Sequence, residues 1–194
     1  MLSSQSATSH GAQSHWLKKY YFVRFAVSAV WVVLAFTLAK TAPQVAAVLL
    51  VAYPAWDALA NFFDAQRNGG LRRNKTQASN LIVSALTAAA VAIALSKDMN
   101  TVLVVFGAWA TLSGIFQLAT AARRWKSVGA QWAMILSGAQ SALAGGFFIK
   151  MAMGAADTIG ITTVAPYAAF GAFYFLLSAI WLTVAEARQK SIRV

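Results

Sequence analysis

Long apolar runs separated by short polar links make up most of the chain. Six runs of about 18 to 24 residues can be recognised, and each matches the roughly 20 residues that an α-helix needs to cross a bilayer. We therefore predict an all-α integral membrane protein with six transmembrane helices. The predicted spans cover residues 22–39, 45–64, 79–96, 101–122, 130–150 and 163–186.

Two tails flank the predicted six-helix transmembrane domain, which covers residues 16–188. Residues 1–15 are rich in Ser, Gln and Ala and lack the basic start and apolar core of a signal peptide, so they are predicted to be a disordered cytoplasmic tail. Residues 189–194 form a short basic tail.

Composition agrees with a membrane protein. The chain is 59% hydrophobic and 11% charged, a larger apolar share than soluble domains have. It contains no cysteine, and its two histidines, His10 and His15, lie in the leading tail. Because thiolate and imidazole ligands are missing from the spans, we expect no metal centre and no cofactor.

The positive charge is distributed unevenly among the links. Thirteen Lys and Arg residues fall on one side of the predicted membrane, and only Lys40, Lys97 and Lys150 fall on the other. Short basic links stay cytoplasmic, so both termini are predicted to be cytoplasmic in a multi-pass protein of a bacterial inner membrane or its eukaryotic equivalent. The net charge of +11 then indicates contact with anionic lipid headgroups on the cytoplasmic side and not with nucleic acid.

The outer links are short and the inner links are basic, which predicts three helical hairpins. Internal repetition supports this arrangement. Residues 106–124 align with residues 170–188 without a gap, and the second span aligns with the fourth at an offset of 56 residues. This second alignment places Asp57 with Ser113 and Asn61 with Gln117, polar residue with polar residue.

Two segments, VAYPAWDALANFFDAQRNGG and FGAWATLSGIFQLATAARR, together with the six spans and hairpin repeats, resemble the HdeD-like family of short-repeat bacterial membrane proteins. The resemblance covers about residues 22–188 and includes no catalytic motif. It implies an inner-membrane protein of a family associated with acid resistance. It assigns no active-site residue to this chain.

A polar stripe interrupts the second span, which also contains Pro54. Tyr53, Asp57, Asn61 and Asp64 are four, four and three residues apart and therefore fall within about 80° of the helix circumference. The fourth and fifth spans carry their own polar residues: Ser113, Gln117, Thr120, Ser137, Gln140 and Ser141. If these stripes face one another, amides and hydroxyls of the fourth and fifth spans bind the Asp57 carboxyl. The candidate intramembrane polar site comprises Tyr53, Asp57, Asn61, Ser113 and Gln117.

Asp57 has two interpretations. Arg24 lies in the first turn of its predicted span, where it can extend back to the interface, so we expect no cation at the depth of Asp57. Desolvation then favours the neutral form of this carboxyl, which could sense or relay protons. The other interpretation is a structural aspartate that joins two helices beside Pro54.

Helix contacts and interfacial charges can also be predicted. Gly138, Ala142 and Gly146 recur every four residues in the fifth span, which indicates close approach of a neighbouring helix. Asp64 and Glu186 lie at the cytoplasmic ends of their spans, and we expect them to form ion pairs with nearby arginines.

The spans contain few polar side chains of the kinds that catalysis uses, which argues against an enzyme. There is no Gly-rich phosphate loop, no Ser-His-Asp set and no pair of carboxylates with a histidine. The leading hypothesis is a non-enzymatic protein of the HdeD-like type, involved in acid or envelope stress tolerance through helix packing and contacts with lipids or partners. One alternative is a small proton-coupled transporter or channel that uses intramembrane Asp57 and is completed by a homo-oligomer. The other is a membrane enzyme or enzyme subunit that acts on lipid.

Overall fold

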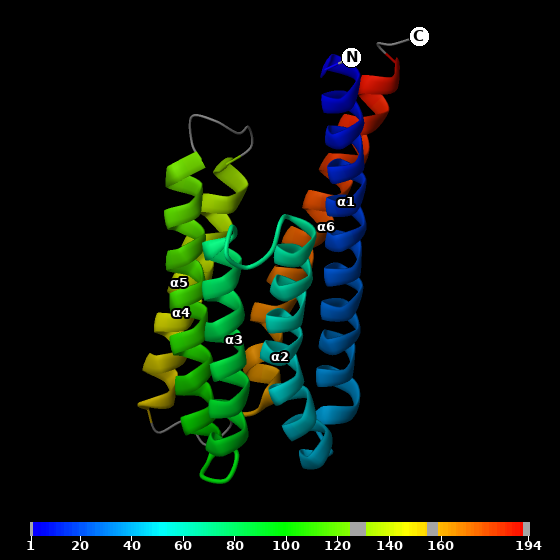
Figure 1. Cartoon of the computed structure of the whole chain (residues 1–194). Helices are drawn as coiled ribbons and strands as arrows, with labels where there is room; N and C mark the ends of the chain where they lie inside the picture. The colour runs from blue at the N-terminus through cyan, green and yellow to red at the C-terminus, as the bar shows by residue number, and fades with distance from the viewer. Residues whose placement is uncertain (1, 125–130, 155–158, 192–194) are drawn as a thin grey trace.

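The computed structural model describes residues 2–124, 131–154 and 159–191. These residues form six α-helices and no strand, and the first helix continues into a short π-helix, η1 (Figure 1). The elements are α1 (Leu2–Leu34), η1 (Ala35–Ala39), α2 (Pro43–Arg67), α3 (Lys75–Ala94), α4 (Met99–Arg124), α5 (Gln131–Ala152) and α6 (Ile161–Ser191).

Five helices in the described part of the chain are long and apolar enough to cross a membrane. These candidate spans are His15–Ala39, Pro43–Arg67, Lys75–Ala94, Met99–Ala119 and Ile161–Arg188. The chain is therefore a helical, multi-pass membrane protein. The crossing of α5, the identity of the membrane and the side that the termini face stay predictions.

The ends of the chain differ from the expected tails. The structure places residues 2–15 in α1, where the sequence predicts a disordered tail, and residues 189–191 in α6. Extending a helix that already exists requires no new nucleus, so a polar segment can continue it at little cost. The first turns of α1 and the last turns of α6 lie side by side at one end of the bundle (Figure 1).

The closest helix pairs are not the predicted hairpins. α4 packs most extensively on α5, α2 on α3, and α1 on α6, whereas α1 contacts α2 only sparsely and α5 contacts α6 only sparsely. Figure 1 shows α1 and α6 as a pair beside the other four helices. A short link only keeps two consecutive helices within reach of each other. Contacts between small residues decide which helices approach closely. The repeat itself stays a prediction.

Glycines allow the close approach of α4 and α5. A Cβ at Gly114 would lie 2.5 Å from the carbonyl oxygen of Gly138 and 2.6 Å from the backbone nitrogen of Ala142, which confirms the predicted contact of these two residues. The prediction for Gly146 is wrong, because a Cβ there would meet nothing within 4 Å. Gly145 takes this place against α4. Gly145 lies seven residues after Gly138, which is close to two full helical turns, so it returns to the contact face. Gly146 lies eight residues after Gly138 and is rotated away from this face.

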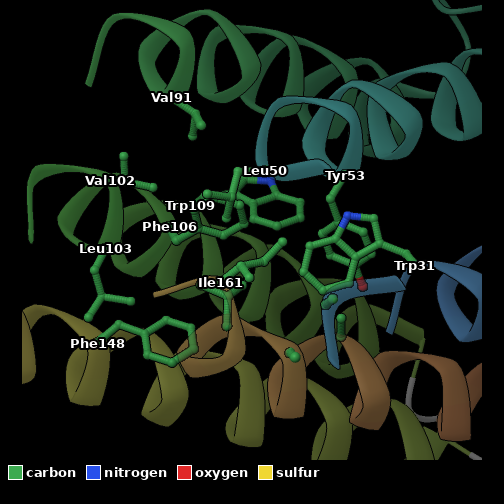
Figure 2. Close-up of a cluster of buried hydrophobic side chains, with 14 of the residues drawn as sticks. Trp31, Leu50, Tyr53, Val91, Val102, Leu103, Phe106, Trp109, Phe148 and Ile161 are labelled. Carbon is green, nitrogen blue, oxygen red and sulfur yellow. The ribbon is translucent and has the colours of Figure 1, made fainter. Parts of the chain in front are cut away.

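Aromatic side chains fill the core at the end of the bundle opposite the two termini. Trp31 and Tyr53 have ring centroids 4.8 Å apart, and Trp109 lies 5.9 Å from Tyr53 and 5.8 Å from Phe106 in edge-on arrangements. Figure 2 shows these rings gathered with aliphatic side chains of α2, α3 and α4. The Trp31 Nε1–H donates to the carbonyl oxygen of Leu49 over 2.7 Å, which joins α1 to α2.

Asp98, in the link between α3 and α4, caps the N-terminus of α4. The backbone N–H of Thr101 donates to Asp98 Oδ1 over 2.6 Å. Hydrogen bonds from Thr101 lower the pKa of Asp98, since they favour its charged form.

Candidate functional site

A cavity of about 1090 Å³ lies within the bundle, and all six helices contribute side chains to its wall. Ligand pockets in proteins typically measure about 300–1,000 Å³, so this cavity is large enough for a small molecule. All five residues of the predicted polar site line it: Tyr53, Asp57, Asn61, Ser113 and Gln117. The structure thus brings the polar stripes of α2 and α4 to one space.

An ion pair between Arg24 of α1 and Asp57 of α2 lies in the wall of this cavity. The Arg24 Nη2 donates to Asp57 Oδ1, and the two side chains are only 13% and 17% exposed. Two expectations are therefore wrong: Asp57 does not lack a cation at its depth, and Arg24 does not extend to the interface. The reason is that α1 begins well before residue 22, so Arg24 lies far inside the helix and not in its first turn.

The sequence contains a signal for this pair. Arg24 lies 16 residues before Lys40, and Asp57 lies 16 residues after Thr41. In two antiparallel helices joined by a short link at residues 40–42, positions at equal distance from the link lie at equal depth. This spacing places the guanidinium and the carboxylate at one level of the membrane.

A hydrogen-bond network holds the Asp57 carboxylate. Asp57 Oδ2 accepts from Asn61 Nδ2 at 3.0 Å and from Ser84 Oγ at 2.8 Å, and Ser84 Oγ accepts from Trp109 Nε1 at 3.0 Å. The sequence predicts partners in the fourth and fifth spans, but Ser84 is in α3, and Trp109 reaches Asp57 only through it. Ser84 was missed because it lies outside the polar stripes that the spacing singled out.

Arg24 combines this ion pair with aromatic contacts. Its guanidinium carbon lies 4.2 Å from the centroid of the Phe175 ring, and Nη1 donates to the hydroxyl of Tyr20 over 3.1 Å. A guanidinium stacks on aromatic faces more readily than an ammonium does, so α1 and α6 hold this cation in a fixed position. Its Nε atom is buried without a hydrogen-bond partner.

The polar residues of α5 are joined to α6 and not to Asp57. Tyr174 donates to Gln140 Oε1 over 2.9 Å, and Ser141 and Tyr167 share a hydrogen bond of 2.9 Å between their hydroxyl oxygens. Ser137 lines the same cavity. Because α5 and α6 contact each other only sparsely, these hydrogen bonds connect the two helices across the cavity.

The acidic residues near the helix ends that are predicted to be cytoplasmic also differ in part from their predicted roles. Glu186 forms an ion pair with Lys18 of α1. Asp64 accepts hydrogen bonds from Asn68 at 2.9 Å and Gln77 at 3.1 Å, so its predicted ion pair is replaced by amide contacts. Among the residues that the structure describes, there is no cluster of three or more His, Cys, Asp or Glu side chains that could hold a metal ion.

The fold and the cavity together define a helical multi-pass membrane protein with a charged pair in its interior. Residues 81–150, which include most of α3, all of α4 and most of α5, match a short repeat of unknown function (DUF308). Comparisons with curated proteins and with solved structures gave no match. The matched segment contains Ser113 and Gln117 of the cavity but neither Arg24 nor Asp57.

Proposed function

We propose that this chain is a non-enzymatic bacterial inner-membrane protein of the HdeD-like type, which binds a small molecule in its intramembrane cavity and thereby supports acid or envelope stress tolerance. The observation that carries the proposal is the cavity of about 1090 Å³ with Arg24 and Asp57 in its wall. Ionisable residues inside a membrane are costly and commonly mark ligand or ion pathways. The short repeat matched by residues 81–150 belongs to the family that includes HdeD proteins, which supports the type.

The state of Asp57 favours binding over catalysis. Its two oxygens accept from Arg24, Asn61 and Ser84, so three protein donors hold the carboxylate. A general base has to reach the proton that it removes, and both oxygens of Asp57 already contact protein donors. We further propose that both termini are cytoplasmic and that the basic links contact anionic lipid headgroups there.

Bacterial survival after acid exposure tests this function. Wild-type protein should increase the survival of a strain that lacks its own copy, and the cavity-filling variant Ala144→Phe should remove at least about nine-tenths of the increase. Ala144 lines the cavity, whereas Gly146, on the same helix, faces open space and lies outside the lining. Gly146→Phe is therefore the matched control and should protect like the wild type.

Membrane abundance of all three proteins must be equal, as measured by immunoblotting of membrane fractions. Survival that does not depend on the wild-type protein would contradict the acid-tolerance role. Equal protection by Ala144→Phe and Gly146→Phe would contradict the role of the cavity.

A second candidate, the proton-coupled transporter, is favoured by the position of Asp57 at the centre of the network. Protonation of this carboxylate would break its ion pair and release Arg24 toward the cavity, which couples proton binding to ligand binding. The other titratable groups around Asp57 are Tyr20 of α1, Tyr53 of α2 and Tyr167 of α6.

Proton uptake into liposomes that contain the purified protein tests this candidate. With a pH-sensitive dye inside and a membrane potential imposed, a proton-coupled transporter takes up protons, and Asp57→Asn should reduce the rate at least about tenfold. Glu186→Gln makes the same chemical change outside the cavity and should leave the rate unchanged. Uptake no faster than in protein-free liposomes would rule out this candidate and leave the binding role in place.

A further inference from the structure

We infer that the ligand of the cavity is an uncharged amphipathic lipid, which enters from the bilayer between α5 and α6 and places its polar end near Arg24, Trp56 and Asn80. The inference rests on the proposed binding function and names its ligand class and route. Three independent features of the described residues carry it: the opening of the cavity, its length, and the chemistry of its wall around Arg24.

If α5 crosses the membrane as predicted, the opening of the cavity faces hydrocarbon. Leu143 and Phe147 of α5 line the cavity and are 75% and 60% exposed, and Phe170 and Trp181 of α6 line it and are exposed as well. Exposed apolar side chains on membrane-spanning helices contact lipid tails. Since α5 and α6 touch only sparsely, the cavity opens between them toward the bilayer and not toward water.

The cavity is long and mostly apolar along α6. Its lining on this helix extends from Thr163 to Leu182, which corresponds to about 28 Å along the helix axis. This length approaches the hydrocarbon thickness of a bilayer of roughly 30 Å. Phe175 and Leu177 of α6 and Phe148 of α5 line the cavity, so an acyl chain placed there would keep apolar surroundings.

The cavity wall around Arg24 offers hydrogen bonds but no net charge. The Nε of Arg24, the Nε1 of Trp56 and the Oδ1 of Asn80 are buried without a partner, which leaves two N–H donors and one carbonyl acceptor. Buried polar atoms are normally paired, so unpaired ones beside a cavity indicate where a ligand binds. Among the described lining residues only Arg24 and Asp57 are charged, and they neutralise each other. A charged headgroup would therefore lose its water without gaining a counter-ion, whereas hydroxyl and ester groups match these donors and acceptors.

The test is quenching of tryptophan fluorescence by brominated lipids in phosphatidylcholine nanodiscs that contain the full chain. The two probes are dibromostearoyl monoglyceride and the phosphate ester of the same monoglyceride, which differ only in the anionic phosphate group. Trp56, Trp109 and Trp181 line the cavity, so a bound bromine atom near them reduces emission. We expect saturable quenching by the monoglyceride at concentrations at least about tenfold lower than by its phosphate.

Variants separate the cavity from the lipid that surrounds every membrane protein. Ala144→Phe should remove the saturable component, and Gly146→Phe should retain it. Asn80→Leu, which removes the free acceptor, should weaken monoglyceride binding about five- to tenfold, the loss expected for one hydrogen bond. Native mass spectrometry of each variant confirms that the protein is intact and reports its oligomeric state.

Each other outcome overturns the inference in a distinct way. Equal quenching by both probes that Ala144→Phe leaves unchanged would show contact with surrounding lipid only. Tighter binding of the phosphate, lost in Ala144→Phe, would reject the uncharged class while keeping the cavity as a binding site and the proposed function with it. A dimer whose formation blocks all saturable quenching would assign the opening between α5 and α6 to a second copy of the chain.

Discussion

Arg24→Met should destabilise the folded protein by about 3–5 kcal/mol, the loss typical of removing one partner from a buried ion pair. The variant leaves the Asp57 carboxylate largely buried, with only the neutral donors Asn61 and Ser84 to compensate its charge. It also removes the contact of the guanidinium with Phe175. The free energy of unfolding can be measured in mixed micelles with increasing sodium dodecyl sulfate, followed by circular dichroism.

Two comparisons make the experiment specific to the pair. In the double variant Arg24→Met with Asp57→Asn, no buried charge is left, so at least half of the lost stability should return. Lys18→Met breaks the ion pair with Glu186 at the end of the bundle, which should cost about 1 kcal/mol or less. A loss in Arg24→Met no greater than in Lys18→Met would show that the interior pair contributes little to stability.

Gly114→Leu should separate α4 from α5 and cost about 2–3 kcal/mol or more. Even its Cβ would lie 2.5 Å from the carbonyl oxygen of Gly138, and a backbone atom cannot move aside as a flexible side chain can. Close contact between small residues is the main source of helix association in a membrane, where the hydrophobic effect no longer favours one pair of helices over another. The same unfolding measurement gives the size of the loss.

Gly146→Leu is the matched control for this helix pair. The position is exposed, and an added Cβ there meets nothing within 4 Å, so the change in stability should stay within about 0.5 kcal/mol. Similar losses in Gly114→Leu and Gly146→Leu would mean that the leucine disturbs the helices themselves and not their contact.

The comparison of these two glycines also shows how far sequence reasoning reaches. The four-residue repeat of small residues correctly identified α5 as a helix that another helix approaches closely, and Gly138 and Ala142 are in that contact. It misplaced the third residue, because 3.6 residues per turn shift the contact face along the helix, and Gly145 returns to this face whereas Gly146 does not.

The polar site was likewise predicted correctly in part and misjudged in part. A spacing of four residues is enough to place Tyr53, Asp57 and Asn61 on one face of α2, and all three line the cavity. The partners of Asp57 could not be chosen by periodicity, because Ser84 is one hydroxyl among several in the spans. Arg24 was misjudged since its depth depends on where α1 begins, and the polar segment before it was not expected to be helical.

The sequence by itself determined that this is a helical membrane protein and where most of its helices begin and end, because about 20 consecutive apolar residues can satisfy their backbone in lipid only as a helix. Only the tertiary structure decided which helices pair, that Arg24 meets Asp57, and that all six helices line one cavity within the bundle. The physical reason is that apolar helix faces are nearly equivalent in hydrocarbon, so a few close contacts between small residues and a few hydrogen bonds select one arrangement among many.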